Sequence, residues 1–128
     1  MVRTFSIIFG TIFALLGFSG FVSNPLVGAN ALFAAGAVYN AMHLVFAAVL
    51  FAATFRRGGD AELALRIIGA VTFLLGFIGL LSIPSSGGSL FAVAYTNGAM
   101  NWFHIVVGIA VFFALRYESD DRTPPSAG

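Results

Sequence analysis

Residues 35–55 read AGAVYNAMHLVFAAVLFAATF, a long apolar run without a charged side chain. The run belongs to a wider pattern, because no charged residue occurs in 4–55 and none occurs in 67–115. Each of these two windows is long enough for two helices of about 20 residues, the length that crosses the hydrocarbon core of a bilayer. The run therefore predicts one membrane-spanning helix, and the two windows together predict four.

Each charge-free window contains one break, SNPLVGAN at 23–30 and SIPSSGGS at 82–89. Both breaks hold proline, glycine and small polar residues, which interrupt helices. The expected spans are about 4–22, 31–55, 63–82 and 90–115. They predict an all-α integral membrane four-helix bundle, a single transmembrane domain over 1–117, followed by a flexible polar tail over 118–128.

The composition agrees with a bilayer as the solvent. Hydrophobic residues make up 59% of the 128 residues, charged residues make up 9%, and the mean hydropathy is +0.99. Soluble domains carry about 25% charged residues, so a water-soluble domain is excluded. The chain has no cysteine, which excludes disulfides and cysteine-based metal sites, and its net charge of +1 gives no basic surface for nucleic acid.

The charged residues predict an orientation. All six positive charges are arginines, and with four spans every one of them falls on the side of the two termini and of the loop RRGGDAE (56–62). The two opposite connections are uncharged. Because positive residues are retained in the cytoplasm, we expect both termini to be cytoplasmic, in the inner membrane of a bacterium.

The chain contains an internal duplication. LLGFSGFVSNP (15–25) matches LLGFIGLLSIP (74–84) at an offset of 59 residues, from Leu15 to Leu74. The second and fourth spans align at an offset of 61, from Asn40 to Asn101. We therefore expect two tandem two-helix hairpins, related by a pseudo-two-fold axis along the membrane normal.

Glycines recur along the first and third spans. Gly10 and Gly17 lie on one face of the first span, and Gly69 and Gly76 repeat the arrangement on the third. Small residues let helix backbones approach closely in a membrane, where lipid gives no hydrophobic drive for helix association. We interpret these glycines as helix-packing residues.

Two polar stripes interrupt the apolar second and fourth spans. Positions four, three and four apart share a face of a helix. One such face holds Gly36, Asn40, His43 and Ala47, and the other holds Asn97, Asn101, His104 and Gly108. Polar side chains within a membrane usually point into the bundle. At a rise of about 1.5 Å per residue, both histidines lie about 18–20 Å from the arginines that follow them, near mid-membrane.

Three interpretations of these stripes stay open. The side chains of Asn and His could only hydrogen-bond neighbouring helices, which contributes about 0.6–2 kcal/mol per bond. Alternatively, His43 and His104 could be axial ligands of haem b or of bacteriochlorophyll magnesium, each oriented by Asn40 or Asn101, because a ligating imidazole needs a partner on its other nitrogen. Third, the stripes could line a conduit for protons or a small solute.

The leading functional interpretation is a non-catalytic protein. No carboxylate occurs in any span to pair with histidine, and the serines of PSSGGS (84–89) have no acid or histidine near them in sequence. We expect an accessory or structural subunit that contacts the lipid bilayer and associates with itself or with other membrane subunits. The tetrapyrrole-binding protein, for electron transfer or light harvesting, is the alternative, and the conduit is the second alternative.

The Asn-x-x-His stretches also carry a family resemblance. Asn101, His104, Ile105 and Gly108 fit an Asn-x-x-His-(Leu/Ile)-x-x-Gly pattern, whereas the first copy has Ala47 where the glycine would be. With the first span ending in LLGFSGF, the chain resembles a family of small four-helix bacterial membrane proteins of unknown function. The resemblance covers nearly the whole chain, implies four spans and brings no established activity.

Overall fold

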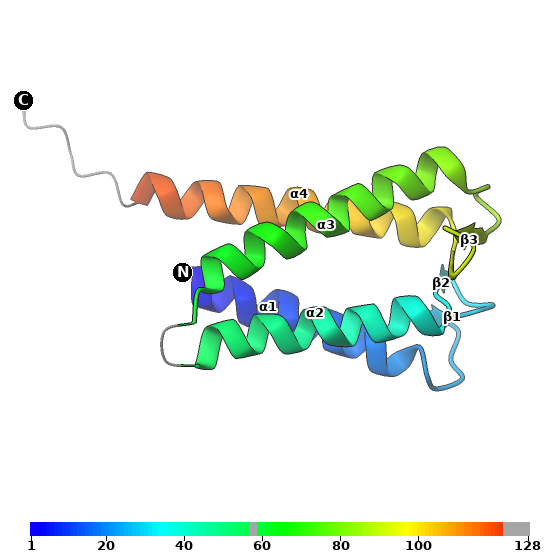
Figure 1. Ribbon diagram of the computed structural model, residues 1–128, viewed down its shortest axis with the longest axis horizontal. Coiled ribbons are helices and arrows are strands. Elements are labelled where there is room, and N and C mark those ends of the chain that lie inside the picture. The colour runs from blue at the N-terminus through cyan, green and yellow to red at the C-terminus, as the bar shows by residue number, and fades with distance from the viewer. Residues whose placement is uncertain (57–58, 122–128) are drawn as a thin grey trace, which may run out of the picture.

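The computed structural model describes residues 1–56 and 59–121, and the backbone alone for 118–121. Its four helices are α1 (Val2–Ser19), α2 (Ala37–Phe55), α3 (Ala61–Ser82) and α4 (Gly98–Asp121) (Figure 1). All four are long and apolar enough to cross a membrane. Their apolar lengths of 18 to 22 residues correspond to about 27–33 Å, close to the thickness of a hydrocarbon core. The expected all-α, four-helix membrane fold is confirmed.

The helices pack as two hairpins, α1 with α2 and α3 with α4. The start of α1, the α2–α3 connection and the last turns of α4 lie at one end of the bundle, and the remaining connections lie at the other end (Figure 1). We call the first the arginine end, because Arg3, Arg56, Arg66 and Arg116 all belong to it. The opposite end is called the cap end.

Two of the expected spans begin too early. The second helix begins at Ala37 rather than at residue 31, and the fourth begins at Gly98 rather than at residue 90. The intervening residues form short strands instead. These are β1 (Val27–Gly28) with β2 (Phe33–Ala34), which pair in parallel, and β3 (Gly88–Leu90) with β4 (Ala94–Thr96), which pair antiparallel. Backbone groups outside a helix need partners, and strand pairing supplies them here.

Asn97 fixes the start of α4. Its Oδ1 accepts a hydrogen bond from the backbone N–H of Met100 (3.0 Å), as an N-cap residue does. The later start also explains Trp102, which is 59% exposed on the second turn of α4, near the cap end, where interfacial tryptophan is common. At its other end α4 continues to Asp121, past the expected domain boundary at 117, and residues 122–128 of the expected tail lie outside the described residues.

The strands form a cap that joins the two hairpins. We call residues 27–36 and 88–97 the β-cap. The N–H of Gly36 donates to the carbonyl of Tyr95 (3.0 Å), and the Nδ2 of Asn97 donates to the carbonyl of Leu32 (3.0 Å). The Oδ1 of Asn97 also accepts from the N–H of Ala34 (3.2 Å). Asn97 therefore links the first hairpin to the second while it caps α4.

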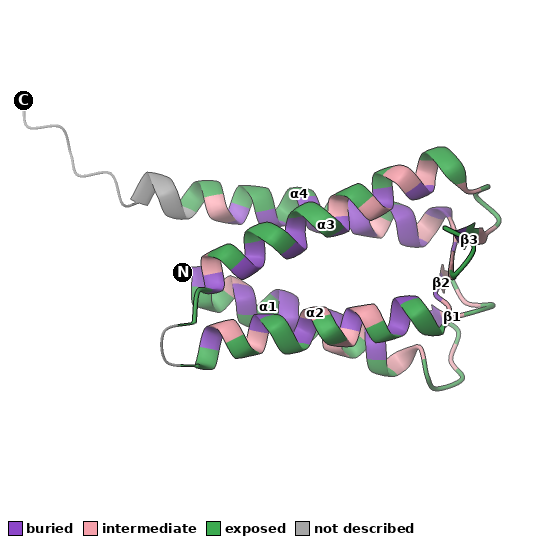
Figure 2. Ribbon diagram, viewed as in Figure 1, coloured by how far each residue is buried: buried purple, intermediate pink, exposed green. Residues whose placement is uncertain are grey.

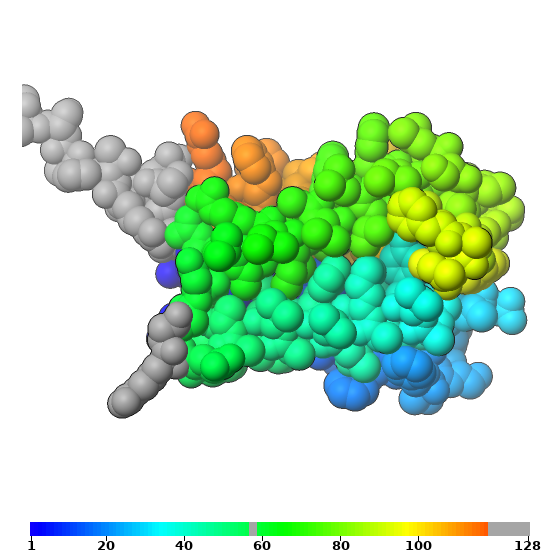
Figure 3. Space-filling model, viewed as in Figure 1, coloured from blue at the N-terminus to red at the C-terminus, as the bar shows by residue number. Residues whose placement is uncertain are grey.

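The buried face of each helix points into the bundle, and its outer face is exposed (Figure 2). Many of the exposed side chains are large and hydrophobic. Fully buried side chains include Phe13, Leu50 and Leu65, and side chains fill the space between the hairpins on the face seen in Figure 3. Phe18 and Leu81 are 66% and 73% exposed. In a bilayer these outer side chains contact lipid rather than water, so the chain is an integral membrane protein.

Glycines occupy the helix contacts inside each hairpin. A Cβ on Gly17 would lie 2.9 Å from the carbonyl oxygen of Asn40, and one on Gly76 would lie 2.9 Å from the backbone nitrogen of Ile105. A Cβ on Gly10 would lie 3.0 Å from the ring of Phe51. A Cβ on Gly69 would lie 2.6 Å from Cγ1 of Val111. The helices of each hairpin approach this closely only because these side chains are absent.

Candidate functional site

The two intramembrane histidines contact each other. The Nε2 atoms of His43 on α2 and His104 on α4 lie 3.0 Å apart, and both side chains are completely buried. One ring donates its Nε2–H to the unprotonated Nε2 of the other ring. The bond joins one helix of each hairpin, so the site is a polar contact between the two halves of the bundle.

Aromatic rings hold the imidazoles in place. The ring of Phe13 on α1 stacks on His43, with centroids 5.7 Å apart and planes inclined by 24°. The ring of Tyr39 stacks on His104, with centroids 5.3 Å apart and planes inclined by 18°. Stacking on these flat surfaces fixes the imidazole planes, and thereby directs the two Nε2 atoms at each other.

The other imidazole nitrogens are left without partners. The Nδ1 atoms of His43 and His104 are buried and accept or donate no hydrogen bond among the described residues. Burying an unsatisfied polar atom costs free energy. Among the described residues, the Nε2–Nε2 contact is therefore the one hydrogen bond that offsets the burial of each ring. Losing that contact would leave a fully buried imidazole with no partner.

Among the described residues, the asparagines hydrogen-bond groups other than the histidines that they were expected to orient. The Nδ2 of Asn40 donates to the carbonyl of Gly20 (2.9 Å), and the Oδ1 of Asn101 accepts from the hydroxyl of Thr96 (3.2 Å). The Asn40 amide packs against Gly20 and the Asn101 amide against Gly79. The reason is position: each asparagine lies one turn nearer the cap end than its histidine, beside a glycine at the cap end of the neighbouring helix.

The packing of Asn40 against Gly20 and of Asn101 against Gly79 was not predicted, although the sequence indicated that the two glycines are equivalent. The two glycines correspond in the duplication, at the same offset of 59 residues that relates Gly17 to Gly76. Equivalent Gly–Asn contacts in both hairpins agree with the proposed duplication. The contact of Thr96 with Asn101 was also not foreseen, because the expected fourth span, 90–115, placed Thr96 within the helix, whereas it ends β4.

A tetrapyrrole does not fit between these histidines. Two axial bonds of about 2.0 Å each need about 4 Å between the ligating nitrogens, with the macrocycle lying between them. Here the two Nε2 atoms are 3.0 Å apart and bind each other. In the described part of the chain, no group of three or more His, Cys, Asp or Glu side chains comes together to hold a metal ion. In this arrangement the two histidines form a hydrogen-bonded imidazole pair.

Fold and site together define a class: a small integral membrane four-helix bundle whose two hairpins meet at a buried histidine pair. The chain belongs to the family described as a domain of unknown function, DUF4383, whose model matches residues 3–115. The family membership agrees with the resemblance stated above. No curated protein and no solved structure matches the chain.

Proposed function

We propose that the protein is a non-catalytic accessory or structural subunit of a larger membrane assembly. The observation that carries the proposal is the contact between His43 and His104. These two imidazoles are the reactive side chains inside the bundle, and they bind each other across the two hairpins. A histidine engaged in this way gives stability and shape rather than reactivity. The sequence adds that no carboxylate lies in 4–55 or 67–115 to act with either ring.

An apolar ridge on α4 supports association with another subunit. Trp102, Val106, Ile109 and Phe113 follow one another at helical spacing and are 59%, 60%, 43% and 65% exposed. Large side chains in a row offer a broad surface against which a second helix packs by van der Waals contact, the main attraction available inside a bilayer. The partner is a second copy of this chain or another membrane subunit.

The proposed setting is the cytoplasmic membrane of a bacterium, with the arginine end in the cytoplasm. It rests on Arg3, Arg56, Arg66 and Arg116, which lie at one end of the bundle, and on the uncharged β-cap at the other. In this orientation the β-cap meets the periplasmic surface.

Native mass spectrometry of vesicles from the source membrane, without detergent extraction, tests the proposal. We expect the 13.4 kDa chain in a defined assembly of larger mass. Val106→Trp, on the ridge, is expected to dissociate that assembly. Val49→Trp, a matched change of a residue that is 44% exposed on α2, is expected to leave it intact.

Two results would contradict the proposal. One is a chain that leaves the membrane only as a monomer. The other is visible absorption, beyond the aromatic band, in the protein purified from its source membrane, if His43→Ala or His104→Ala removed it. Such a band would revive the tetrapyrrole alternative.

A further inference from the structure

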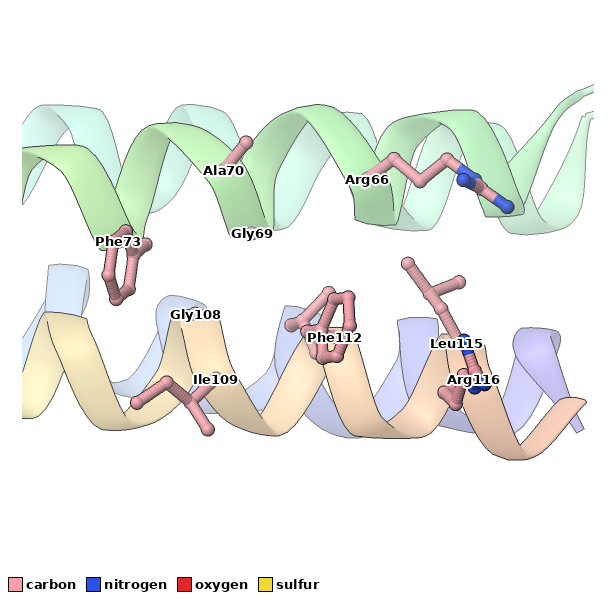
Figure 4. Close-up of a pocket in the computed structure, with 10 residues that line it drawn as sticks. Arg66, Gly69, Ala70, Phe73, Gly108, Ile109, Phe112, Leu115 and Arg116 are labelled. Atoms are coloured by element: carbon pink, nitrogen blue, oxygen red, sulfur yellow. The ribbon is translucent and has the colours of Figure 1, made fainter.

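A groove of about 560 Å³ runs between α3 and α4 towards the arginine end. Its volume falls within the range of small-molecule sites, about 300–1,000 Å³. The groove is separate from the histidine pair, which does not line it. Figure 4 shows its residues, with Phe73 towards one end and the guanidinium groups of Arg66 and Arg116 towards the other.

The glycine contact between the helices makes the deep part of the groove. A Cβ on Gly108 would lie 2.9 Å from the carbonyl oxygen of Gly69, so the two backbones touch there. From Gly108 to Arg116 the helix rises about 12 Å. Phe112 and Leu115 line the groove over this distance. The groove is therefore apolar along its length and basic at one end.

We propose that this groove binds one anionic phospholipid from the leaflet at the arginine end. An acyl chain would lie along the groove between Phe112 and Phe73, and the phosphate would lie between Arg66 and Arg116. Guanidinium groups bind phosphate oxygens with paired, charge-assisted hydrogen bonds. Basic sites between membrane helices are a recurrent way to bind anionic headgroups.

The electrostatics of the groove end favour an anion. Arg66 donates to Glu62 one turn earlier, with the Arg66 Nη2 and the Glu62 Oε1 2.7 Å apart. The Arg66 side chain is 59% exposed in that ion pair, and exposed pairs contribute little to stability, so the guanidinium can turn towards a phosphate. Arg116 lines the same end of the groove, so two guanidinium groups lie there, whereas a neutral headgroup would gain little from them.

The groove also opens to the membrane rather than to water. Its lining residues Gly69, Phe73 and Gly108 lie within the apolar parts of α3 and α4. Phe112 is 62% exposed at its edge. A molecule that enters from the side must therefore be a component of the bilayer, which favours a lipid over a water-soluble anion or a soluble peptide. This inference does not rest on the proposed accessory role.

The test is lipid binding to the purified full-length protein in a neutral detergent, counted by native mass spectrometry. The probes are phosphatidylglycerol and, as the neutral control, phosphatidylcholine with the same acyl chains. We expect one phosphatidylglycerol per chain, held about tenfold more tightly than phosphatidylcholine, the ratio that one strong phosphate contact gives. Arg66→Gln/Arg116→Gln is expected to abolish that preference. Arg56→Gln, a change of the exposed arginine that directly follows α2 at the same end, is the matched control and is expected to keep the preference.

A second pair of variants tests the acyl chain site. Ala70 lines the groove and is exposed, so Ala70→Phe fills the groove without entering the core. Ala48→Phe makes the same change at an exposed position of α2. Ala70→Phe is expected to lose the bound phosphatidylglycerol and Ala48→Phe to retain it.

Two outcomes would overturn the proposal. One is equal affinity for both lipids in the wild-type protein, or an unchanged preference in the double arginine variant, which would show that the arginines do not recognise the headgroup. The other is undiminished binding to Ala70→Phe, which would place the lipid elsewhere. The helical circular dichroism of each variant checks folding, and the arginine pair tests the headgroup even if Ala70→Phe does not fold.

Discussion

His43 and His104 show how two residues of the same type can satisfy each other in a membrane. Neither ring has another hydrogen-bond partner among the described residues, and both lie where water does not reach. The histidines could be selected from sequence because each sits alone in an apolar helix at a duplicated position. The equal depth of the two rings, on the second and fourth spans, already indicated that they face each other across the bundle, whereas the packing of Phe13 and Tyr39 around the rings could not be predicted.

A double-mutant cycle measures the coupling between the two rings. His43→Ala and His104→Ala are each expected to lower the free energy of unfolding by about 1–3 kcal/mol, because each leaves one buried imidazole unpaired. The double variant is expected to lose less than the sum, since the second substitution removes an already unpaired group. Unfolding in mixed micelles followed by circular dichroism gives the values. Val45→Ala, on the exposed face of α2, is the control and is expected to change little, whereas strict additivity of the two histidine variants would contradict a direct bond.

Among the secondary-structure elements, the four helices were predicted well from the charge-free windows and from the breaks at 23–30 and 82–89. The connections at the cap end were predicted poorly. Residues 31–36 and 90–97 are apolar enough to extend a helix, so hydropathy alone includes them. Their strand pairing depends on contacts between the two hairpins, such as the bond from Gly36 to Tyr95, which no local pattern reveals. Asn97 carried the one local signal, as an N-cap residue before an apolar run.

The close contact between α3 and α4 predicts that a larger side chain at Gly76 lowers the stability of the protein. Gly76→Ala puts a methyl group against the backbone of α4, at the carbonyl of Asn101 and the nitrogen of Ile105. Although alanine favours helices more than glycine does, we expect a loss of about 1–3 kcal/mol in the free energy of unfolding, because backbone atoms must move. Leu74→Ala, on the exposed face of the same helix, is the control and should lose much less. A stabilised Gly76→Ala variant would contradict the close contact.

The turn between β3 and β4 has an unusual backbone. Phe91 and Ala92 have φ values of 51° and 62°, and Val93 N–H donates to the carbonyl of Leu90 (3.2 Å). This left-handed conformation costs about 1–2 kcal/mol for a residue with a Cβ. Ala92→Gly is therefore expected to raise the free energy of unfolding by about 1 kcal/mol. Ala94→Gly, in β4, serves as the control and should give no gain; equal effects of the two changes would contradict the turn geometry.

At the scale of the whole molecule, the two ends of the bundle differ in charge and in structure. The helix ends with arginines lie together, and the uncharged β-cap closes the other end (Figure 1). The sequence predicted this polarity, because the arginines and the breaks alternate along the chain. The β-cap, which joins the hairpins, depends on the three-dimensional arrangement and could not be predicted, whereas the sequence already indicated that the two histidines lie at the same depth inside the bundle.

The orientation can be tested with introduced cysteines, because the chain has none of its own. Tyr117→Cys lies at the arginine end and Ser86→Cys at the cap end, and both positions are exposed. In intact bacterial cells, a membrane-impermeant maleimide is expected to label Ser86→Cys and to spare Tyr117→Cys until the membrane is opened. The reverse pattern would contradict the proposed orientation.

Nuclear magnetic resonance of the protein with ¹⁵N-labelled histidine, in lipid bilayers, is the most direct test of the hydrogen bond between His43 and His104. We expect a scalar coupling between one protonated and one unprotonated Nε2, carried through the hydrogen bond between His43 and His104, and absent from His104→Ala. Two uncoupled imidazoles, or nitrogen shifts typical of metal ligation, would contradict the claim that the two histidines bind each other and hold the hairpins together.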